Sequence, residues 1–397
     1  MPGAHALIAL HPPRRPPPAA PARAAARRVL PRVCFVGLEN LPVLARAYEQ
    51  HGIGGEQVQH TLLARALVRR GFDASMVVAD YGQPDGLEID GVRLHRAHAL
   101  DAGLPVVRFL HPRLTGLWRA LGRADAQLYY VSTASSQLGV VAAFARRHGR
   151  RVVFRIAHDL DCDPKRLLIR FWRDRKLYEW GLRRADTVLA QSQQQRAALR
   201  ANYGLHSRVA AMLVEPATRD LAFEARDVPV LWVNNLRPFK RPDLALVLAQ
   251  RLPEQRLHMI GGPQDGHEGL FDATRRQAAA IGNLQFHGRV AYHDVNDFYE
   301  RAQVFVNTSD SEGFPNSYLQ AWRRGVPTVS FFDPDGLIAR FGLGHAARSL
   351  EDMALAVQRL THNADEWHAA SARCRHFMDE HYGDDTVLRP YLEALGG

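Results

Sequence analysis

Short apolar runs and amphipathic segments alternate along most of this chain. RVCFVGL (32–38) is a compact apolar run typical of a buried strand, and VQHTLLARALVRRG (58–71) has helical spacing that ends on glycine. The order strand, helix, strand recurs in AQLYYVS, QLGVVAAFARRHG and RRVVFRIAHD, and continues to RVAAMLVEP. Because this alternation places a helix between successive strands, it predicts parallel sheets covered by helices.

The same pattern restarts in the second half of the chain. VPVLWVNNL (228–236), QRLHMIGG and QVFVNTS predict strands, and residues 347–395 have helical spacing throughout. Residues near 215–228 have no clear period and predict a linker. The predicted fold class is α/β, with two Rossmann-like domains whose parallel sheets face each other across a cleft. The predicted parts are a disordered basic tail rich in Pro, Ala and Arg (1–31), an N-terminal domain (32–218), a C-terminal domain (226–380) and a C-terminal helix (381–397).

Length and composition exclude several protein classes. A chain of 397 residues is too long for one simple core. It has no run of about 18 apolar residues, and HALIAL is too short for the apolar part of a signal peptide, so we expect a cytoplasmic protein without a membrane span. The three cysteines, Cys34, Cys162 and Cys374, are scattered, which fits a reducing compartment.

The positive charge is concentrated at one end of the chain. The net charge is +10, but residues 1–32 hold six arginines and no acid, so the remainder carries only +4. Such a tail favours weak contact with anionic surfaces. Lysine is rare, because 48 of the 51 basic residues are arginine and only Lys165, Lys176 and Lys240 are lysine.

One stretch combines a loop, a helix start and a strand. SEGFPNSYLQAWRRGVPTVSF (311–331) follows the strand QVFVNTS, at the kind of strand end where open α/β sheets bind ligands. We expect Asn316 and Ser317 to cap a helix that begins near Tyr318 and offers its free N–H groups to a phosphate. Glu312 suits the hydroxyls of a sugar better than an anion.

This stretch resembles the donor-binding signature of family 4 retaining glycosyltransferases (glycosyl transferases group 1), enzymes of the GT-B fold. The resemblance is specific at 305–331 and weaker over roughly 32–390. It implies that Glu312 lies near the donor sugar and that Phe314, Pro315, Asn316 and Ser317 bind the donor. The family's second Glu, which holds the ribose, is replaced by Gln320, which accepts a hydrogen bond as a neutral partner and predicts weaker or tuned nucleotide affinity.

Further positions match the donor site of this family. In NNLRPFKRPDLAL (234–246), Lys240 matches the lysine that neutralises the leaving diphosphate, whereas Asn235 stands where the family has arginine and Arg237 is the best substitute. HGIGGEQVQH (51–60) resembles the family's glycine-rich loop, with Gly54 and Gly55 approaching the phosphates; a flexible turn is the alternative. Weaker resemblances place Gly261, Gly262, Arg289 and Val290 near the nucleotide base.

RIAHDLDCD (155–163) ends a predicted strand that faces the cleft. By resemblance His158 lies beside the donor sugar, with Asp159 as the alternative, although a lone histidine is often structural. The spacing D-L-D and D-C-D also resembles a metal motif of the other glycosyltransferase fold. We favour no metal, because the second domain already supplies cations for the phosphates.

PKRLLIRFWRDRKLYEWGLRRA (164–185) carries eight bases, two acids and four aromatic residues. One interpretation is a basic amphipathic helix on an anionic bilayer. The preferred interpretation is a helix that packs inside the first domain with a charged outer face.

The resemblance implies a metal-independent hexosyltransferase that retains anomeric configuration and needs no cofactor. It implies a nucleoside diphosphate sugar as donor, bound by the C-terminal domain, and a saccharide or lipid-linked acceptor, bound by the N-terminal domain onto which the C-terminal helix returns. By association with the family we expect a role in cell-envelope or exopolysaccharide assembly, a location at the inner face of the membrane and peripheral contact with that membrane. We expect no specific nucleic acid as a partner. The alternatives are a catalytically degenerate nucleotide-binding protein and a nucleic-acid or membrane-surface binding protein built on the basic tail.

Overall fold

The computed structural model describes residues 30–49, 53–103, 109–264 and 266–396. The predicted basic tail, except for its last two residues, lies outside the described residues, as do His51 and Gly52 of the glycine-rich loop. Within the described part, no helix has both the length and the apolar character to cross a bilayer.

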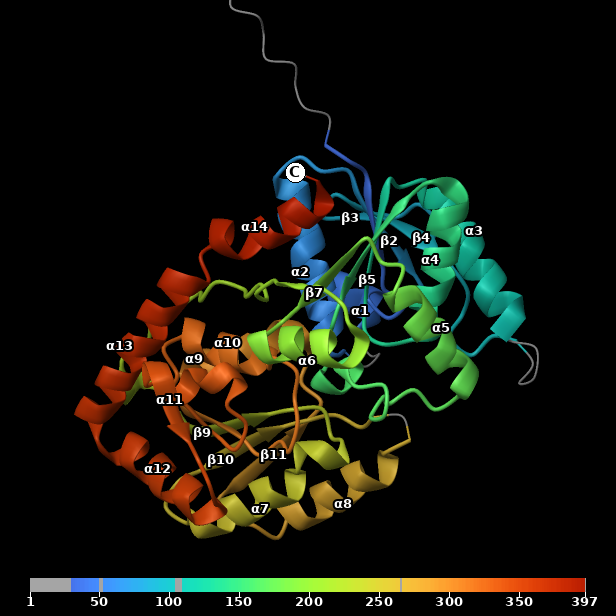
Figure 1. Ribbon diagram of the computed structural model, residues 1–397. Helices are drawn as coiled ribbons and strands as arrows, with labels where there is room; N and C mark the ends of the chain where they lie inside the picture. Colours follow the sequence, from blue (N-terminus) through green and yellow to red (C-terminus); the bar gives the residue numbers. More distant parts are fainter. Residues whose placement is uncertain (1–29, 50–52, 104–108, 265, 397) are drawn as a thin grey trace, which may run out of the picture.

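The first half of the chain forms one sheet with helices on its faces (Figure 1). Its strand order is β3-β4-β2-β1-β5-β6-β7-β8, and every neighbouring pair is parallel except β3 with β4. The central strands are fully buried because helices cover both faces, which explains their continuous apolar runs. The strands are β1 (Val33–Val36), β2 (Ala74–Val78), β3 (Glu88–Ile89), β4 (Val92–Arg96), β5 (Leu128–Ser132), β6 (Arg151–Arg155), β7 (Thr187–Ala190) and β8 (Arg208–Val209), and the helices are α1 (Leu41–Leu44), α2 (Gly55–Arg69), α3 (Thr115–Ala124), α4 (Ser136–His148), α5 (Trp172–Leu182) and α6 (Gln193–Tyr203).

The second half repeats this architecture with an entirely parallel sheet. Its order is β11-β10-β9-β12-β13-β14. The strands are β9 (Val228–Val233), β10 (Leu257–Ile260), β11 (Leu284–Gly288), β12 (Ala302–Asn307), β13 (Thr328–Ser330) and β14 (Gly344–Ala346), and the helices are α7 (Pro242–Arg251), α8 (Glu268–Ala278), α9 (Tyr292–Arg301), α10 (Asn316–Arg323), α11 (Leu337–Phe341), α12 (Leu350–His362), α13 (Ala364–His381) and α14 (Asp384–Leu395). The predicted α/β fold class with two parallel sheets is confirmed.

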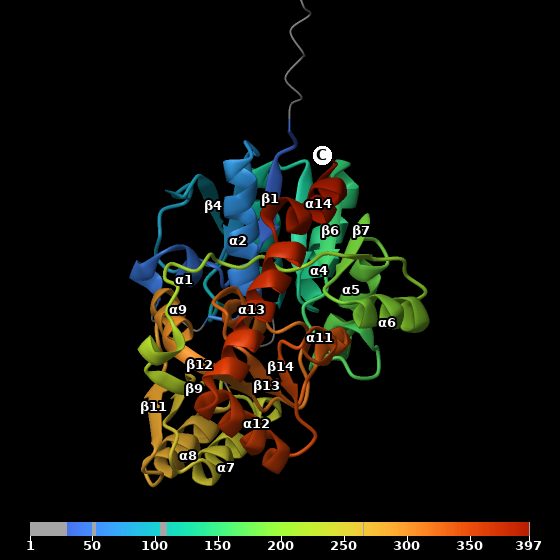
Figure 2. The same ribbon diagram turned by 90° about the vertical axis from the view of Figure 1, so that its left-hand side faces the viewer.

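We call each sheet with its covering helices a unit. The C-terminal helix α14 lies against the sheet of the first unit, although α13 before it packs in the second unit (Figure 2). The Tyr391 hydroxyl donates a hydrogen bond of 2.9 Å to the Ala211 carbonyl, and Arg151 donates one of 2.9 Å to the Ala394 carbonyl. One buried apolar cluster also runs from strands of the first sheet to strands of the second. These contacts hold the carboxyl edges of the two sheets toward each other.

The basic segment 164–185 is helical only from Trp172. Helix α5 packs tightly on α4, because a methyl group at Gly139 would stand 2.6 Å from the Leu177 carbonyl oxygen. Tyr178 and Leu182 point inward from α5 and are buried. The preferred interpretation, a helix packed inside the first unit, therefore holds for α5. The residues before Trp172 form a largely exposed loop instead of continuing the helix.

Candidate active site

The candidate site is centred on Lys240 and Glu312, which both lie at the carboxyl edge of the second sheet. Lys240 ends a short 3-10 turn after β9, and Glu312 lies in the loop between β12 and α10. Lys240 Nζ and Glu312 Oε2 form a close ion pair, and the side chains are only 15% and 7% exposed. Asn307 Nδ2 donates to the other carboxylate oxygen at 3.3 Å. The lysine and the acid that the sequence singled out separately are thus direct partners.

The backbone around Lys240 is fixed from β12. The Thr308 hydroxyl lies 3.0 Å from the Lys240 carbonyl oxygen and 2.9 Å from that of Arg241. Arg241 adopts a left-handed conformation with φ of 49°, which turns the chain sharply into α7. The sequence between β9 and α7 therefore places Lys240 at the strand end and returns immediately to a covering helix.

His158 belongs to the same cluster but comes from the first unit. Its ring stands edge-on to Phe239 with centroids 5.8 Å apart. Its Nδ1 accepts a hydrogen bond of 3.1 Å from the Leu160 amide, so Nε2 carries the proton, and this buried Nε2–H has no partner within the described residues. Burial lowers the pKa of His158 to about 4, with the nearby Lys240 and Arg237 lowering it further against the opposing effect of Glu312. The neutral ring therefore offers a hydrogen-bond donor at neutral pH.

The glycine-rich loop reaches across to the start of α10. The Asn316 side-chain amide donates 2.7 Å to the Gly55 carbonyl and accepts 3.0 Å from Gln59. A methyl group at Gly55 would stand 2.6 Å from Asn316 Nδ2, so glycine is what permits this close approach. On the opposite side of the loop, Asn235 Nδ2 donates 3.1 Å to the Ile53 carbonyl.

The predicted capping of α10 is wrong in detail. The helix begins at Asn316, its N-cap is Pro315, and no side chain caps it. The Asn316 side chain instead hydrogen-bonds the glycine-rich loop, and the Ser317 side chain hydrogen-bonds Tyr299. The first N–H groups of α10 therefore have no capping side chain, which keeps them available to an anion.

Gln320 lies deeper than a surface ligand. It is buried, and its side-chain oxygen accepts a hydrogen bond of 2.8 Å from Arg324. Arg324 also lies 3.7 Å from the carboxylate of Glu300, whose pKa falls to about 2 because hydrogen bonds from Arg219 and Thr218 outweigh its burial. Gln320 is therefore a neutral acceptor that is already engaged by Arg324.

The remaining predicted donor residues have partners outside this centre. Arg237 is exposed and donates 3.2 Å to Gln264. A methyl group at Gly261 would stand 2.5 Å from the Asn234 carbonyl oxygen, and one at Gly262 would stand 2.8 Å from Arg289 Nε. Val290 is half-buried and Phe314 is a core residue whose ring packs against Trp322 and Tyr382.

Two contributors escaped the sequence reasoning. Gln191, just after β7, accepts a hydrogen bond of 2.8 Å from the Phe314 amide, and its oxygen would stand 2.6 Å from a methyl group at Gly313. Asn307, the last residue of β12, orients Glu312. Both are polar residues at strand ends, which is the signal that could have identified them.

A second polar cluster lies beneath the glycine-rich loop. Arg155 is fully buried, its Nη1 is 3.8 Å from Glu56 Oε2, and its side chain also interacts with the Tyr130 hydroxyl. Burial raises the pKa of Glu56 to about 7 against the lowering effect of Arg155. The first turn of α2 thus carries a carboxyl group that titrates near neutrality.

The three aspartates that resembled a metal motif serve different partners. Asp159 accepts from Gln195 at 2.9 Å, Asp161 from the His158 amide at 3.1 Å, and Asp163 from the Lys165 amide at 2.9 Å. No group of three metal-binding side chains gathers anywhere in the part of the chain that the structure describes.

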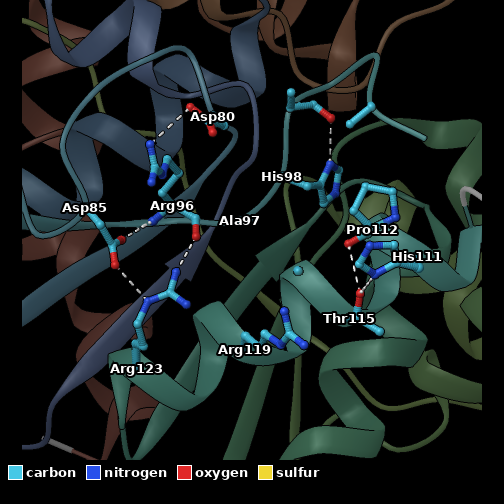
Figure 3. A pocket seen from close by; sticks show the side chains of 13 residues that line it. Asp80, Asp85, Arg96, Ala97, His98, His111, Pro112, Thr115, Arg119 and Arg123 are labelled. Carbon is cyan, nitrogen blue, oxygen red and sulfur yellow. Dashed lines mark hydrogen bonds and ion pairs between the residues drawn. The ribbon is translucent and has the colours of Figure 1, made fainter.

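A polar cavity of about 440 Å³ opens at the carboxyl ends of β2 and β4 (Figure 3). Arg96 and Arg123 on its wall pair with Asp80 and Asp85, whereas Arg119 makes no hydrogen bond or ion pair within the described residues. The cavity lies about four strand positions from His158, roughly 19 Å at a spacing of about 4.8 Å. It therefore lies along the same sheet edge as His158 but is separate from the centre that His158 forms with Lys240 and Glu312.

Comparison of the sequence with known protein families identifies two domains. Residues 54–214 match the model described as "Glycosyl transferase 4-like domain", and residues 229–363 match "Glycosyl transferases group 1". The mannosylfructose-phosphate synthase of Agrobacterium fabrum is 30% identical over 173 residues, which are 37% of this chain and 38% of that protein. The match thus spans less than half the length of this curated relative.

Solved structures show the same fold at low sequence identity. A sucrose-phosphate synthase from Thermosynechococcus elongatus superposes with a TM-score of 0.68 at 18% identity, covering 92% of this chain and 96% of that one. HepE from Anabaena, solved with UDP and glucose, gives 0.67 at 14% identity and covers 92% and 99%. The two family models lie in succession along the two sheets, so the chain is a glycosyltransferase of the GT-B fold with a glycosyl transferase 4-like domain followed by a glycosyl transferases group 1 domain.

Proposed function

We propose that this protein transfers a sugar from a nucleoside diphosphate donor to a saccharide or lipid-linked acceptor with retention of configuration. The observation that carries the proposal is the cluster of Lys240, Glu312 and the unpartnered Nε2–H of His158 where the two sheets meet. A buried donor without a partner is costly, and a sugar hydroxyl would satisfy it.

Each group has a role in this reaction. Lys240, assisted by Arg237, neutralises the diphosphate as the bond from the anomeric carbon to the phosphate oxygen breaks. Glu312 and His158 hold the hydroxyls of the donor sugar, and the uncapped start of α10 with the backbone of Gly54 and Gly55 receives phosphate oxygens.

The acceptor oxygen then bonds to the anomeric carbon from the side that the phosphate leaves. Its proton passes to the departing phosphate oxygen, so the step requires no protein nucleophile. Because Lys240 is already paired with Glu312, the diphosphate must displace or share this partner, which couples donor binding to a change in the site.

The acceptor belongs on the first unit in this proposal. The polar cavity beside Arg119 offers hydrogen-bond donors and acceptors suited to a part of a polyhydroxylated or anionic acceptor that is remote from the reacting hydroxyl. The mannosylfructose-phosphate synthase and the sucrose-phosphate synthase are named for phosphorylated sugars, and the HepE complex holds UDP, so UDP-sugars come first among donors to test. Assembly of a cell-envelope or exopolysaccharide in the cytoplasm would suit a lipid-linked acceptor.

A thermal-shift panel with UDP, GDP, ADP and their common sugars tests this proposal. Ligand at a hundredfold excess over Kd stabilises by about 2.7 kcal/mol, which is several degrees for domains of this size. We expect one base to raise Tm equally with and without EDTA. A shift abolished by EDTA would contradict the metal-independent site, and binding without any turnover across a panel of acceptors would favour the degenerate alternative.

A further inference from the structure

The exposed apolar side chains of the first unit are concentrated in one place. Four of the seven large hydrophobic side chains that are clearly exposed lie there, within residues 109–172 of the described chain. They are Leu110, Leu168, Phe171 and Trp172, exposed by 61%, 63%, 54% and 76%. The segments that carry them touch, because the Arg173 guanidinium stacks 3.7 Å above the Phe109 ring.

Cations alternate with these side chains along the loop before α5. We call Leu110, residues 165–173 and Lys176 the aromatic-basic patch. Lys165, Arg166 and Arg170 are exposed and make no ion pair within the described residues. Residues 163–176 hold six bases against two acids. Arg173 pairs with Asp174 at 2.9 Å and Lys176 with Glu179 at 3.3 Å, which leaves Lys165, Arg166, Arg170 and Arg175 without an ion pair within the described residues. The charge that remains on this patch is therefore strongly positive.

The patch is built on a fixed scaffold. The Arg175 guanidinium donates 2.6 Å to the Ile169 carbonyl and 3.4 Å to the Leu167 carbonyl, which ties the loop to α5. Helix α5 is anchored on α4 through the close contact at Gly139. Exposure of Phe171 and Trp172 therefore follows from the local structure, since their loop is held in place while their own side chains point outward.

We propose that the aromatic-basic patch docks this protein on an anionic lipid bilayer, with Trp172 and Phe171 at the level of the headgroups. Aromatic side chains flanked by cations are suited to that interface, where apolar rings enter and the charges meet lipid phosphates. A second copy of the chain is a poorer occupant, because the same patch would bring two sets of unpaired cations together.

The position of the patch also suits a lipid-linked acceptor. His111 and Pro112, which follow Leu110 directly, line the polar cavity beside Arg119. An acceptor whose lipid part stays in the bilayer would thus enter from the patch side. This link to the acceptor rests on the proposed transferase function, whereas docking on the bilayer does not.

Vesicle co-sedimentation of the full chain tests the docking. The probes are phosphatidylcholine vesicles with and without about one third phosphatidylglycerol. We expect binding to the anionic vesicles only, weakened by salt. Replacing Lys165, Arg166 and Arg170 together with serine should weaken it by about a hundredfold, at roughly fivefold for each cation.

The apolar half of the patch is tested by Leu168→Ser, Phe171→Ser and Trp172→Ser in one chain. Because these side chains are exposed, Tm should change little and vesicle binding should fall at least tenfold. Leu355→Ser is the matched control, since Leu355 is 54% exposed on α12 of the second unit. In the wild-type chain, brominated lipid should quench tryptophan fluorescence, and Trp172→Phe should remove most of that quenching.

Three outcomes would overturn the proposal. The first is equal binding to neutral and anionic vesicles. The second is unchanged vesicle binding of both triple variants together with loss of binding when residues 1–29 are deleted. The third is the formation of oligomers without vesicle binding. The nucleotide-induced shift in Tm is measured on every variant. If it persists while vesicle binding is absent, the docking proposal fails and the transferase proposal stands.

Discussion

Replacing Lys240 with alanine separates the catalytic importance of this residue from its structural importance. Lys240 is the partner of Glu312 in an ion pair whose members are mostly buried. If the lysine neutralises the leaving diphosphate, its loss removes one charge that acts in the transition state. Removing one such group typically costs a factor of about 10²–10³ in kcat, or roughly 3–4 kcal/mol.

The same substitution also destabilises the fold. It leaves the Glu312 carboxylate buried with one remaining hydrogen bond, from Asn307 at 3.3 Å. An uncompensated buried polar group costs about 1–3 kcal/mol, which lowers Tm by several degrees in domains of this size. The double variant Lys240→Ala with Glu312→Gln removes the orphaned charge and should recover most of that stability.

Turnover and Tm measured on the same samples decide between the two roles. We expect Lys240→Ala to lose both turnover and stability, and the double variant to regain Tm without regaining turnover. Arg276→Ala is the control, because Arg276 is an exposed cation of α8 with no ion pair in the described chain. Near wild-type kcat in folded Lys240→Ala would refute the assignment of the lysine to the diphosphate.

Four other predictions follow from the described contacts. Gly55→Ala should weaken nucleotide binding about tenfold by calorimetry, because its methyl group would stand 2.6 Å from a side-chain nitrogen at the start of α10, whereas Gly282→Ala, with open space around it, should not. Gln320→Glu should tighten binding about fivefold if this residue meets the ribose, since a charged acceptor bonds more strongly; unchanged affinity would place the ribose elsewhere. Burial raises the pKa of Glu56 to about 7, from 4.5 in the unfolded chain, so the free energy of unfolding is highest below pH 4.5 and falls by up to about 3 kcal/mol as pH rises through 7. Tm measured against pH should show this fall in the wild-type chain and not in Glu56→Gln. Deleting residues 1–29 should leave turnover with a soluble acceptor unchanged, and its loss would support the alternative built on the basic tail.

The fold class follows from the amino-acid pattern, and this pattern together with the family resemblance names most members of the candidate site. Period and run length identify strands and helices because burial on a sheet or a helix repeats at a fixed spacing. Lys240, Glu312 and His158 follow predicted strands, and the ends of parallel strands share one edge of a sheet. Local pattern was therefore enough to place Lys240 and Glu312 at the carboxyl edge of one sheet and His158 at that of the other, without showing which of them touch.

Which of these residues contact each other depends on how the strands and the two units pack in three dimensions. Lys240 and Glu312 are 72 residues apart, and their contact depends on β9 lying next to β12. Asn316 left its predicted capping role because the glycine-rich loop of the other unit lies beside it. Contacts between units are set by the docking of two sheets and the return of α14, which are sums of many distant interactions. No periodicity along the chain encodes either the strand order within a sheet or the docking of the units, so the sequence names Lys240, Glu312 and His158 without showing that they lie together.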